Sequence, residues 1–172
     1  MKNSSGFTLL EIVLVLIIVG IITLFSTFGL IDVMKSYIQN RQYIESALKL
    51  NIAVSRIYRE LKELHGIYGI SSDKISYLRD NTHYAIALVD NEIKMSLNST
   101  YPNEDFGYVL LDKVSSFNLS PKKADGSNWT TLDAISDLGR IDVGITLDTN
   151  PPIEVFFSVN PWFNDTYNGP GS

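Results

Sequence analysis

The feature that most constrains this chain is an uncharged apolar run from Ile12 to Ile31, close to the N-terminus. A hydrocarbon core about 30 Å thick needs about 20 apolar residues in a helix, and the run supplies that length between Glu11 and Asp32. The buried helix of a water-soluble protein rarely contains so long a stretch without a charge. The run therefore predicts one membrane-spanning helix.

The residues on either side of the run argue against a cleaved secretory signal peptide. Such a peptide carries several positive charges, then a short apolar core, then a cleavage site of small residues. Here Lys2 is the only positive residue ahead of the run, and no Ala-x-Ala pattern follows it. An ordinary signal anchor would explain the hydropathy, but it would not explain the order Gly-Phe-Thr-Leu-Leu-Glu at residues 6–11.

Glu11 is the unusual residue at the margin of the run. A carboxylate carried to the centre of a membrane costs about 2.5–3.5 kcal/mol, and ionisable residues retained in spans usually have a function. A buried ion pair offsets much of the cost of an isolated charge. We therefore expect Glu11 to have a cationic partner.

The N-terminus resembles that of the type IV pilin-like superfamily, which comprises type IV pilins and type II secretion pseudopilins. The resemblance rests on a short polar leader ending in Gly6, the aromatic Phe7, Glu11 and the apolar run. It implies that a prepilin peptidase cleaves between Gly6 and Phe7 and that Phe7 is then N-methylated. It also implies that Glu11 pairs with the free amine of a neighbouring subunit during assembly.

The resemblance further implies a location and a set of partners. The chain would cross the cytoplasmic (inner) membrane once, with its leader in the cytoplasm and its head outside, and would be associated with a fibre after assembly. Its partners would be other pilins or pseudopilins through the N-terminal helix, the prepilin peptidase, the inner-membrane assembly platform and the membrane itself.

Composition excludes several classes of function. The chain has no cysteine, so a disulfide framework, a thiolate metal site and a thiol nucleophile are all ruled out. Residues 1–65 carry a net charge of +2 and residues 66–172 a net charge of −7. An acidic head repels phosphate backbones, so we expect no direct binding of nucleic acid.

Helical periodicity continues beyond the apolar run. No proline occurs between Phe7 and His65, and polar residues, Glu60 among them, fill the side opposite an apolar stripe. Gly66 is a plausible stop. The stripe consists of Ile44, Ala47, Leu48, Val54, Ile57, Tyr58, Leu61 and Leu64.

The second half of the chain alternates with period two, which indicates strands. Residues 82–89 and 92–97 predict a hairpin around Asp90-Asn91, and residues 108–111 and 114–119 predict a further strand or pair. Residues 141–147 and 153–159 predict another hairpin with one buried face, which the apolar stripe of the helix would cover. The predicted fold class is α+β, with a long N-terminal helix packed on an antiparallel sheet, as in pilins.

These patterns divide the chain into five predicted segments. They are a leader (1–6), a transmembrane and polymerisation helix (7–31), its amphipathic continuation (32–65), an antiparallel β head (66–163) and a flexible tail (164–172).

We find no residues spaced for catalysis or for a cofactor. His65 and His83 match no metal-ligand or triad spacing, and a structural role is the more economical interpretation. Asp133, Asp137 and Asp142 form an acidic cluster that we predict in a loop before a strand. Their spacing matches no EF-hand, and either calcium binding or solvation and capping stays open. Trp129, Trp162 and Phe163 form either an exposed recognition patch or part of the core, and we favour the core.

The head adds a weaker resemblance, to the J-type minor pseudopilins of type II secretion and to related type IV minor pilins. It rests on residues 109–117, Trp129, residues 139–145 and residues 156–159. The resemblance implies a minor pilin or pseudopilin that assembles into, or primes, a pilus-like filament and is not an enzyme. The alternative is a membrane-anchored extracytoplasmic binding module that does not polymerise.

Overall fold

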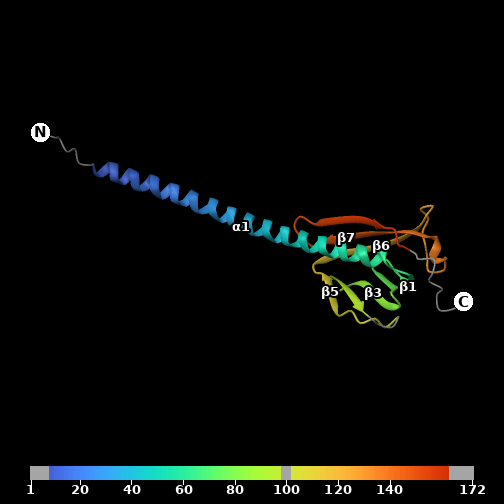
Figure 1. Cartoon of the computed structure of the whole chain (residues 1–172). Coiled ribbons are helices and arrows are strands. Elements are labelled where there is room, and N and C mark those ends of the chain that lie inside the picture. The colour runs from blue at the N-terminus through green and yellow to red at the C-terminus, as the bar shows by residue number, and fades with distance from the viewer. Residues whose placement is uncertain (1–7, 98–101, 163–172) are drawn as a thin grey trace. The chain divides into compact units, whose positions relative to one another are not determined.

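One long helix is followed by eight strands in two antiparallel sheets (Figure 1). The computed structural model describes residues 8–97 and 102–162, without the side chains of residues 26–29. Helix α1 runs from Leu9 to Lys62 without a break, as expected for a stretch that contains no proline. The predicted α+β fold class is confirmed, with the strands divided between two sheets where one was expected.

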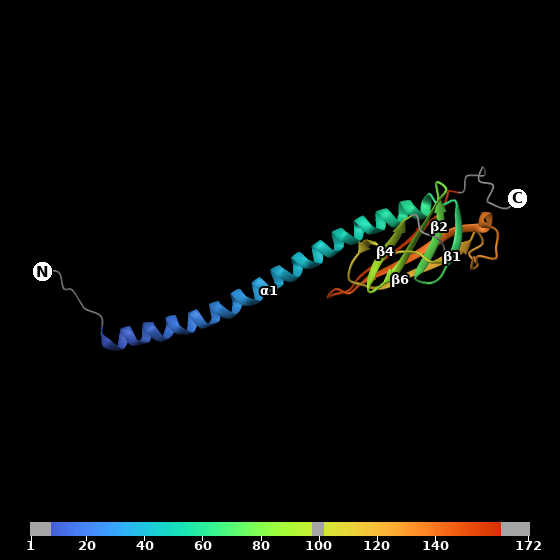
Figure 2. The same cartoon turned by 90° about the horizontal axis from the view of Figure 1, so that it is seen from below.

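The chain divides into two compact units, Met1–Ile44 and Glu45–Ser172. The described part of the first unit is α1 up to Ile44. The second unit, called the head below, contains the rest of α1 and all the described strands, and in it the helix lies along the sheets (Figure 1 and Figure 2). The predicted leader and tail, residues 1–6 and 164–172, lie outside the described residues.

The first sheet of the head has the order β1-β2-β3-β4-β5, with all neighbours antiparallel. Asp90 and Asn91, between β3 and β4, both have positive φ angles, which the two-residue loop of a type I′ hairpin requires. Val89 pairs with Glu92 across this loop, so the predicted hairpin is confirmed. The strands are β1 (Gly66–Ile70), β2 (Lys74–Arg79), β3 (Thr82–Val89), β4 (Glu92–Leu97) and β5 (Tyr108–Leu111).

The second sheet consists of β6 (Val114–Lys123), β7 (Leu138–Leu147) and β8 (Ile153–Val159), with the short 3-10 helix η1 (Ile135–Asp137) before β7. Leu147 pairs with Ile153, which confirms the predicted C-terminal hairpin. Although β5 and β6 are separated by two residues, they belong to different sheets. Lys113, with a φ angle of 56°, lies at this change of direction.

Helix α1 ends at Lys62, three residues before the predicted end at His65. The backbone N–H of His65 donates a hydrogen bond to the carbonyl of Leu78 in β2, at 2.8 Å. Because the amide of His65 already takes part in strand pairing, it is not available to a further helical turn.

The core of the head forms where α1 meets both sheets. Buried residues recur on the helix at intervals of three and four, as one helical face requires, and they join one cluster with residues of β2 to β8. The predicted stripe is correct at Ile57, Leu61 and Leu64 and wrong at Ile44, Leu48 and Tyr58, which are exposed. The buried face consists instead of Leu50, Ala53, Ile57, Glu60, Leu61 and Leu64.

Candidate functional site

Helix α1 begins with a capping arrangement at Thr8. The backbone N–H of Glu11 donates to the hydroxyl Oγ1 of Thr8 at 3.3 Å and to its carbonyl oxygen at 3.0 Å. Thr8 and Glu11 are three residues apart, which is the spacing of the Ser/Thr-x-x-Glu capping box. The residues of the resemblance motif therefore also specify where the helix starts, a signal that our sequence analysis did not use.

Glu11 lies in the first turn of α1 and is exposed. A carboxylate there is favoured by the positive end of the helix dipole. Within residues 8–97 and 102–162, no cation pairs with its side chain. Gly6 and Phe7, the predicted cleavage pair, lie outside these residues.

The described side chains of the apolar run, those of residues 12–25, 30 and 31, are exposed. Of the described residues, only those of α1 form a helix long and apolar enough to cross a membrane, and its most apolar stretch has no residue buried within the molecule. The hydroxyl of Thr23 donates to the carbonyl of Val19 at 2.8 Å, which satisfies a polar group inside the run. Such a surface is stable in lipid and costly in water.

Residues 1–27 match the family model for the prokaryotic N-terminal methylation motif. The motif is typical of type IV pilin-like proteins. It implies processing by a prepilin peptidase and assembly with other pilins, and together with the apolar helix it fits a membrane-anchored pilin. Proteins with this motif are structural rather than catalytic. No curated protein matches the chain.

A buried carboxylate lies at the other end of the same helix. Glu60, which we predicted on the exposed polar face, has a fully buried side chain, so that prediction was wrong. Tyr77 donates its hydroxyl to Glu60 Oε2 at 3.0 Å, and Arg79 pairs with the same oxygen. Arg56 Nη2 lies 2.8 Å from Oε1. These partners hold the last turns of α1 against β2.

The environment of Glu60 changes the titration of both β2 partners. Burial raises the pKa of the Tyr77 phenol well above its usual value, and the neighbouring Glu60 carboxylate raises it further. Burial alone would lower the pKa of Arg79, but the hydrogen bond and charge of Glu60 outweigh it and raise that pKa. Both shifts favour the protonated forms, so at neutral pH Tyr77 keeps its hydroxyl proton and Arg79 keeps its charge, and both can donate to Glu60.

A second buried carboxylate belongs to the connection between β4 and β5. Glu104 accepts hydrogen bonds from Lys74 Nζ at 2.8 Å and from the Ser76 hydroxyl at 2.5 Å. Burial alone would raise the pKa of this carboxyl, but the bonds from Lys74 and Ser76 outweigh it and lower the pKa. Sequence patterns alone did not single out Glu104, because its partners on β2 are about thirty residues away along the chain.

The three aspartates predicted in one loop lie in different elements: Asp133 precedes η1, Asp137 ends η1 and Asp142 lies within β7, so the loop prediction was wrong for Asp137 and Asp142. Asp133 pairs with Lys123 at 2.6 Å and caps Thr130, whereas Asp142 pairs with Arg140 and accepts from Ser158. The cation and the hydrogen bonds to Asp133 lower the pKa of its carboxyl. Among the described residues, no group of three or more His, Asp or Glu side chains is arranged to hold a metal ion. The capping interpretation therefore accounts for Asp133.

The remaining candidate residues have structural surroundings. His83 in β3 packs edge-on against Tyr68, with ring centres 5.0 Å apart, and His65 Nδ1 accepts from the backbone N–H of Asp80 at 3.4 Å. Trp129 is buried and donates to the carbonyl of Ala134, so its assignment to the core is confirmed. Trp162 is largely exposed, so the same assignment was wrong for it; Phe163 lies outside the described residues.

Proposed function

We propose that this chain is a minor pilin or pseudopilin, a structural subunit that assembles into or primes a type IV pilus-like filament. The observation that carries the proposal is the match of residues 1–27 to the N-terminal methylation motif. The motif contains the start of the apolar helix α1, and that helix buries none of its most apolar stretch within the molecule. A filament supplies the missing contacts, because neighbouring helices of the same kind can pack against this surface.

Glu11 has a defined role in this proposal. After cleavage between Gly6 and Phe7, the new amine of Phe7 would lie four residues from Glu11 in the same chain and would be free to meet the Glu11 carboxylate of a neighbour. Two unit charges 4 Å apart attract by about 4 kcal/mol at an effective dielectric of 20. That attraction offsets the cost of holding each charge near lipid.

The system that the filament serves is a finer part of the proposal. Residues 109–117 and 139–145 resemble both the J-type minor pseudopilins of type II secretion and the related minor pilins of type IV pili, which share the same order of motifs, so the proposal includes both systems. The J-type similarity implies a place at the filament tip, where such subunits prime assembly. In either system the partners are other pilins, the prepilin peptidase and the inner-membrane assembly platform.

Mass spectrometry of the N-terminus tests the proposal directly. The protein would be isolated from membranes and from sheared fibres of its native host. We expect a chain that begins with N-methylated Phe7 in both fractions. An intact Met1 found only in membranes would overturn the filament proposal and would favour an anchored binding module that does not polymerise.

A further inference from the structure

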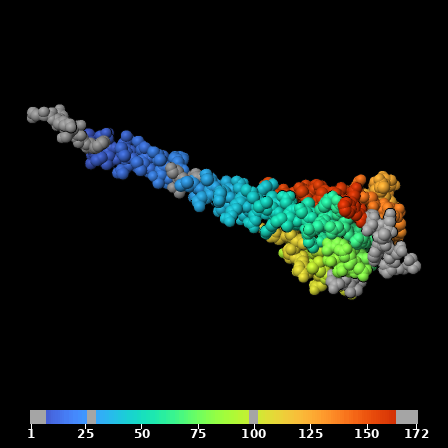
Figure 3. All heavy atoms as spheres, in the orientation of Figure 1, coloured from blue at the N-terminus to red at the C-terminus, as the bar shows by residue number. Residues whose placement is uncertain are grey.

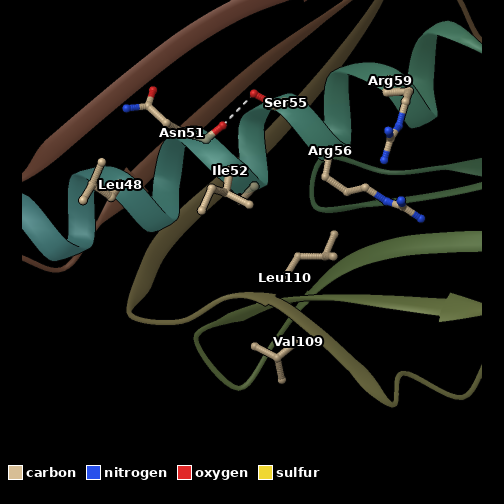
Figure 4. A pocket seen from close by; sticks show the side chains of 9 residues that line it. Leu48, Asn51, Ile52, Ser55, Arg56, Arg59, Val109 and Leu110 are labelled. Carbon is tan, nitrogen blue, oxygen red and sulfur yellow. Dashed lines mark hydrogen bonds between the residues drawn. The ribbon is translucent and has the colours of Figure 1, made fainter.

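The head carries an open groove between helix α1 and strand β5. It has a volume of about 650 Å³. Figure 4 shows the side chains of Ile52, Arg56 and Arg59 on the helix directed toward the strand that bears Val109 and Leu110. The lining residues are Leu48, Asn51, Ile52, Ala53, Ser55, Arg56, Arg59, Val109 and Leu110.

The apolar part of this groove is exposed to an unusual degree. Leu48 is 59% exposed, Ile52 72% and Val109 52%. Leu48 and Ile52 lie outside the buried face of the helix, and none of the three residues belongs to the core cluster of the head. Contiguous exposed apolar side chains of this kind mark contact surfaces.

The charge in the groove is basic and only partly neutralised. Arg56 pairs with the buried Glu60. The guanidinium of Arg59 has no ion-pair or hydrogen-bond partner in the part of the chain that the structure describes. An occupant should therefore present a large apolar side chain with a carboxylate close beside it.

The chain itself presents such a pair on strand β8. Phe156 is 74% exposed, and Glu154, two residues earlier on the same face of the strand, is exposed and has no side-chain partner within the described residues. The ring of Phe156 lies over Gly144, where it comes within 2.9 Å of the place that a Cβ atom would take. The ring is thus held in position by the sheet beneath it.

Two other apolar residues of the head that are more than 70% exposed, Leu132 and Trp162, lack this combination. Leu132 is 97% exposed, but its neighbour Asp133 is already paired with Lys123. Trp162 has the ammonium of Lys62 over its ring, at 4.5 Å, and so offers a cation.

We propose that the groove of one copy binds strand β8 of a second copy, with Phe156 against Leu48, Ile52 and Val109 and with Glu154 paired to Arg59. Glu154 and Phe156 are about 7 Å apart along the strand. On the helix, Arg59 lies about 10 Å from Ile52, and its long side chain can reach back across the difference of about 3 Å.

The two surfaces lie on opposite sides of the helical part of the head. Figure 3 shows β8 in red and β5 in yellow with the helix between them. One copy therefore cannot place its β8 in its own groove. A contact between two different surfaces repeats from copy to copy and does not close on itself unless the rotation forms a ring. Such a repeated, open contact is the kind that produces a filament.

This inference rests on the proposed function and selects one of its two forms. A chain whose head binds a second copy is incorporated repeatedly, whereas a subunit present once at a tip has no use for the contact. Removal of the leader, measured on the same samples, tests the filament proposal separately. A correctly processed chain without the head contact would overturn only the inference.

Cysteine cross-linking tests the contact, because the full chain contains no cysteine of its own. Two differently tagged full-length copies, one with Ile52→Cys and one with Phe156→Cys, would be produced together and oxidised in membranes. We expect a mixed dimer. Leu132→Cys in place of Phe156→Cys is the matched control, since it is more exposed but lies outside the proposed contact, and we expect no dimer from it.

A charge exchange then identifies the ion pair. Arg59→Glu in the Ile52→Cys copy should lower the yield of mixed dimer by about tenfold or more, because like charges then face each other. Adding Glu154→Arg to the Phe156→Cys copy should restore it. Arg41→Glu, on an exposed part of the helix away from the groove, should leave the yield unchanged.

Three results would overturn the proposal. The first is a yield no greater than that of the Leu132→Cys control. The second is a dimer that forms only between two Ile52→Cys copies, which would mean that the groove covers itself. The third is a yield that Arg59→Glu does not lower or that Glu154→Arg does not restore.

Discussion

Helix α1 carries one carboxylate near each end, and the two have opposite surroundings. Glu11 lies in the first turn, exposed, in a unit whose described residues offer it no cation. Glu60 lies in the last turn, fully buried, with Arg56, Tyr77 and Arg79 around it. Both residues are glutamates of one helix, but the described residues of the molecule supply partners to the carboxylate of Glu60 and none to that of Glu11.

The difference follows from what each part of the helix packs against. From Leu50 onward, α1 contributes to a core that it shares with both sheets, and this core brings the β2 side chains to Glu60. The first unit has only the helix among its described residues, so Glu11 depends on lipid and on other molecules. The head thus has a core of its own, whereas the described part of the first unit has none.

The largest effect that we expect is the loss of Glu11. Glu11→Ala should reduce the fibre-associated protein by more than about tenfold, because leaving one member of a desolvated ion pair unpaired costs about 2–5 kcal/mol. Immunoblots of sheared fibres and membranes would measure the ratio. Glu45→Ala, another exposed glutamate of α1, is the control and should have little effect. Normal recovery of the Glu11→Ala protein in fibres would mean that this carboxylate is not an assembly residue.

Glu60→Ala should destabilise the head by about 3–5 kcal/mol, since it leaves Arg79 partly buried without its partner. Unfolding by denaturant, followed by the fluorescence of the buried Trp129, would measure the change. Glu63→Ala, three residues away and exposed, should change the free energy of unfolding by no more than about 0.5 kcal/mol. Equal effects of the two substitutions would contradict the contrast between the buried and exposed faces.

Isoleucine occurs on both the buried and the exposed face of α1, so replacing it by alanine on each face compares their contributions to the free energy of unfolding. Ile57→Ala should cost about 2–5 kcal/mol, because it opens a cavity in the core. Ile52→Ala, in the exposed groove, should stay within about 0.5 kcal/mol. Ile17→Ala, in the apolar run, should leave the stability of the head unchanged. The same unfolding measurement applies to all three variants, and a loss at Ile17 would show that the two units do not fold independently.

The smallest effect concerns pH and Glu104. Its pKa is lowered in the folded head, because the bonds from Lys74 and Ser76 outweigh burial. The unfolded chain therefore binds the proton more readily, and the contribution of Glu104 is present above the ordinary value of 4.5 and is lost as the pH falls through the lower folded pKa.

Glu104→Gln should accordingly remove about 1 kcal/mol of stability at neutral pH and flatten the acid limb of the stability curve. Unfolding midpoints at neutral pH and below 4.5 would measure both changes. A variant with an unaltered acid limb would show that Glu104 is not linked to folding. Glu92→Gln is a suitable control, because Glu92 is paired with Lys94 in an accessible position.

Much of the local structure was predictable. The hairpins around Asp90-Asn91 and around Asn150-Pro151-Pro152 form at the predicted residues, because the alternation and the turn residues lie close together in the sequence. The Thr8–Glu11 cap could also have been predicted from the sequence, since its two residues are three positions apart, but we did not predict it. The predictions that failed concern residues whose partners lie far away along the chain. Glu60 and Glu104 depend on β2 residues that no local pattern connects to them, and the separation of β5 from β6 depends on which face each strand has to cover.

The apolar run at residues 12–31, the methylation motif at residues 1–27 and the positions of the hairpins could be found from the amino-acid sequence alone, since each depends on neighbouring residues and on the period of one element. Only the tertiary structure decided which face of α1 is buried, because several helical faces between Ile44 and Leu64 carry enough apolar residues to pack. Once Leu50, Ala53 and Ile57 faced the sheets, the helical period carried Glu60 inward. With that face buried, the side chains of Leu48 and Ile52 stay exposed beside β5, where they line the groove.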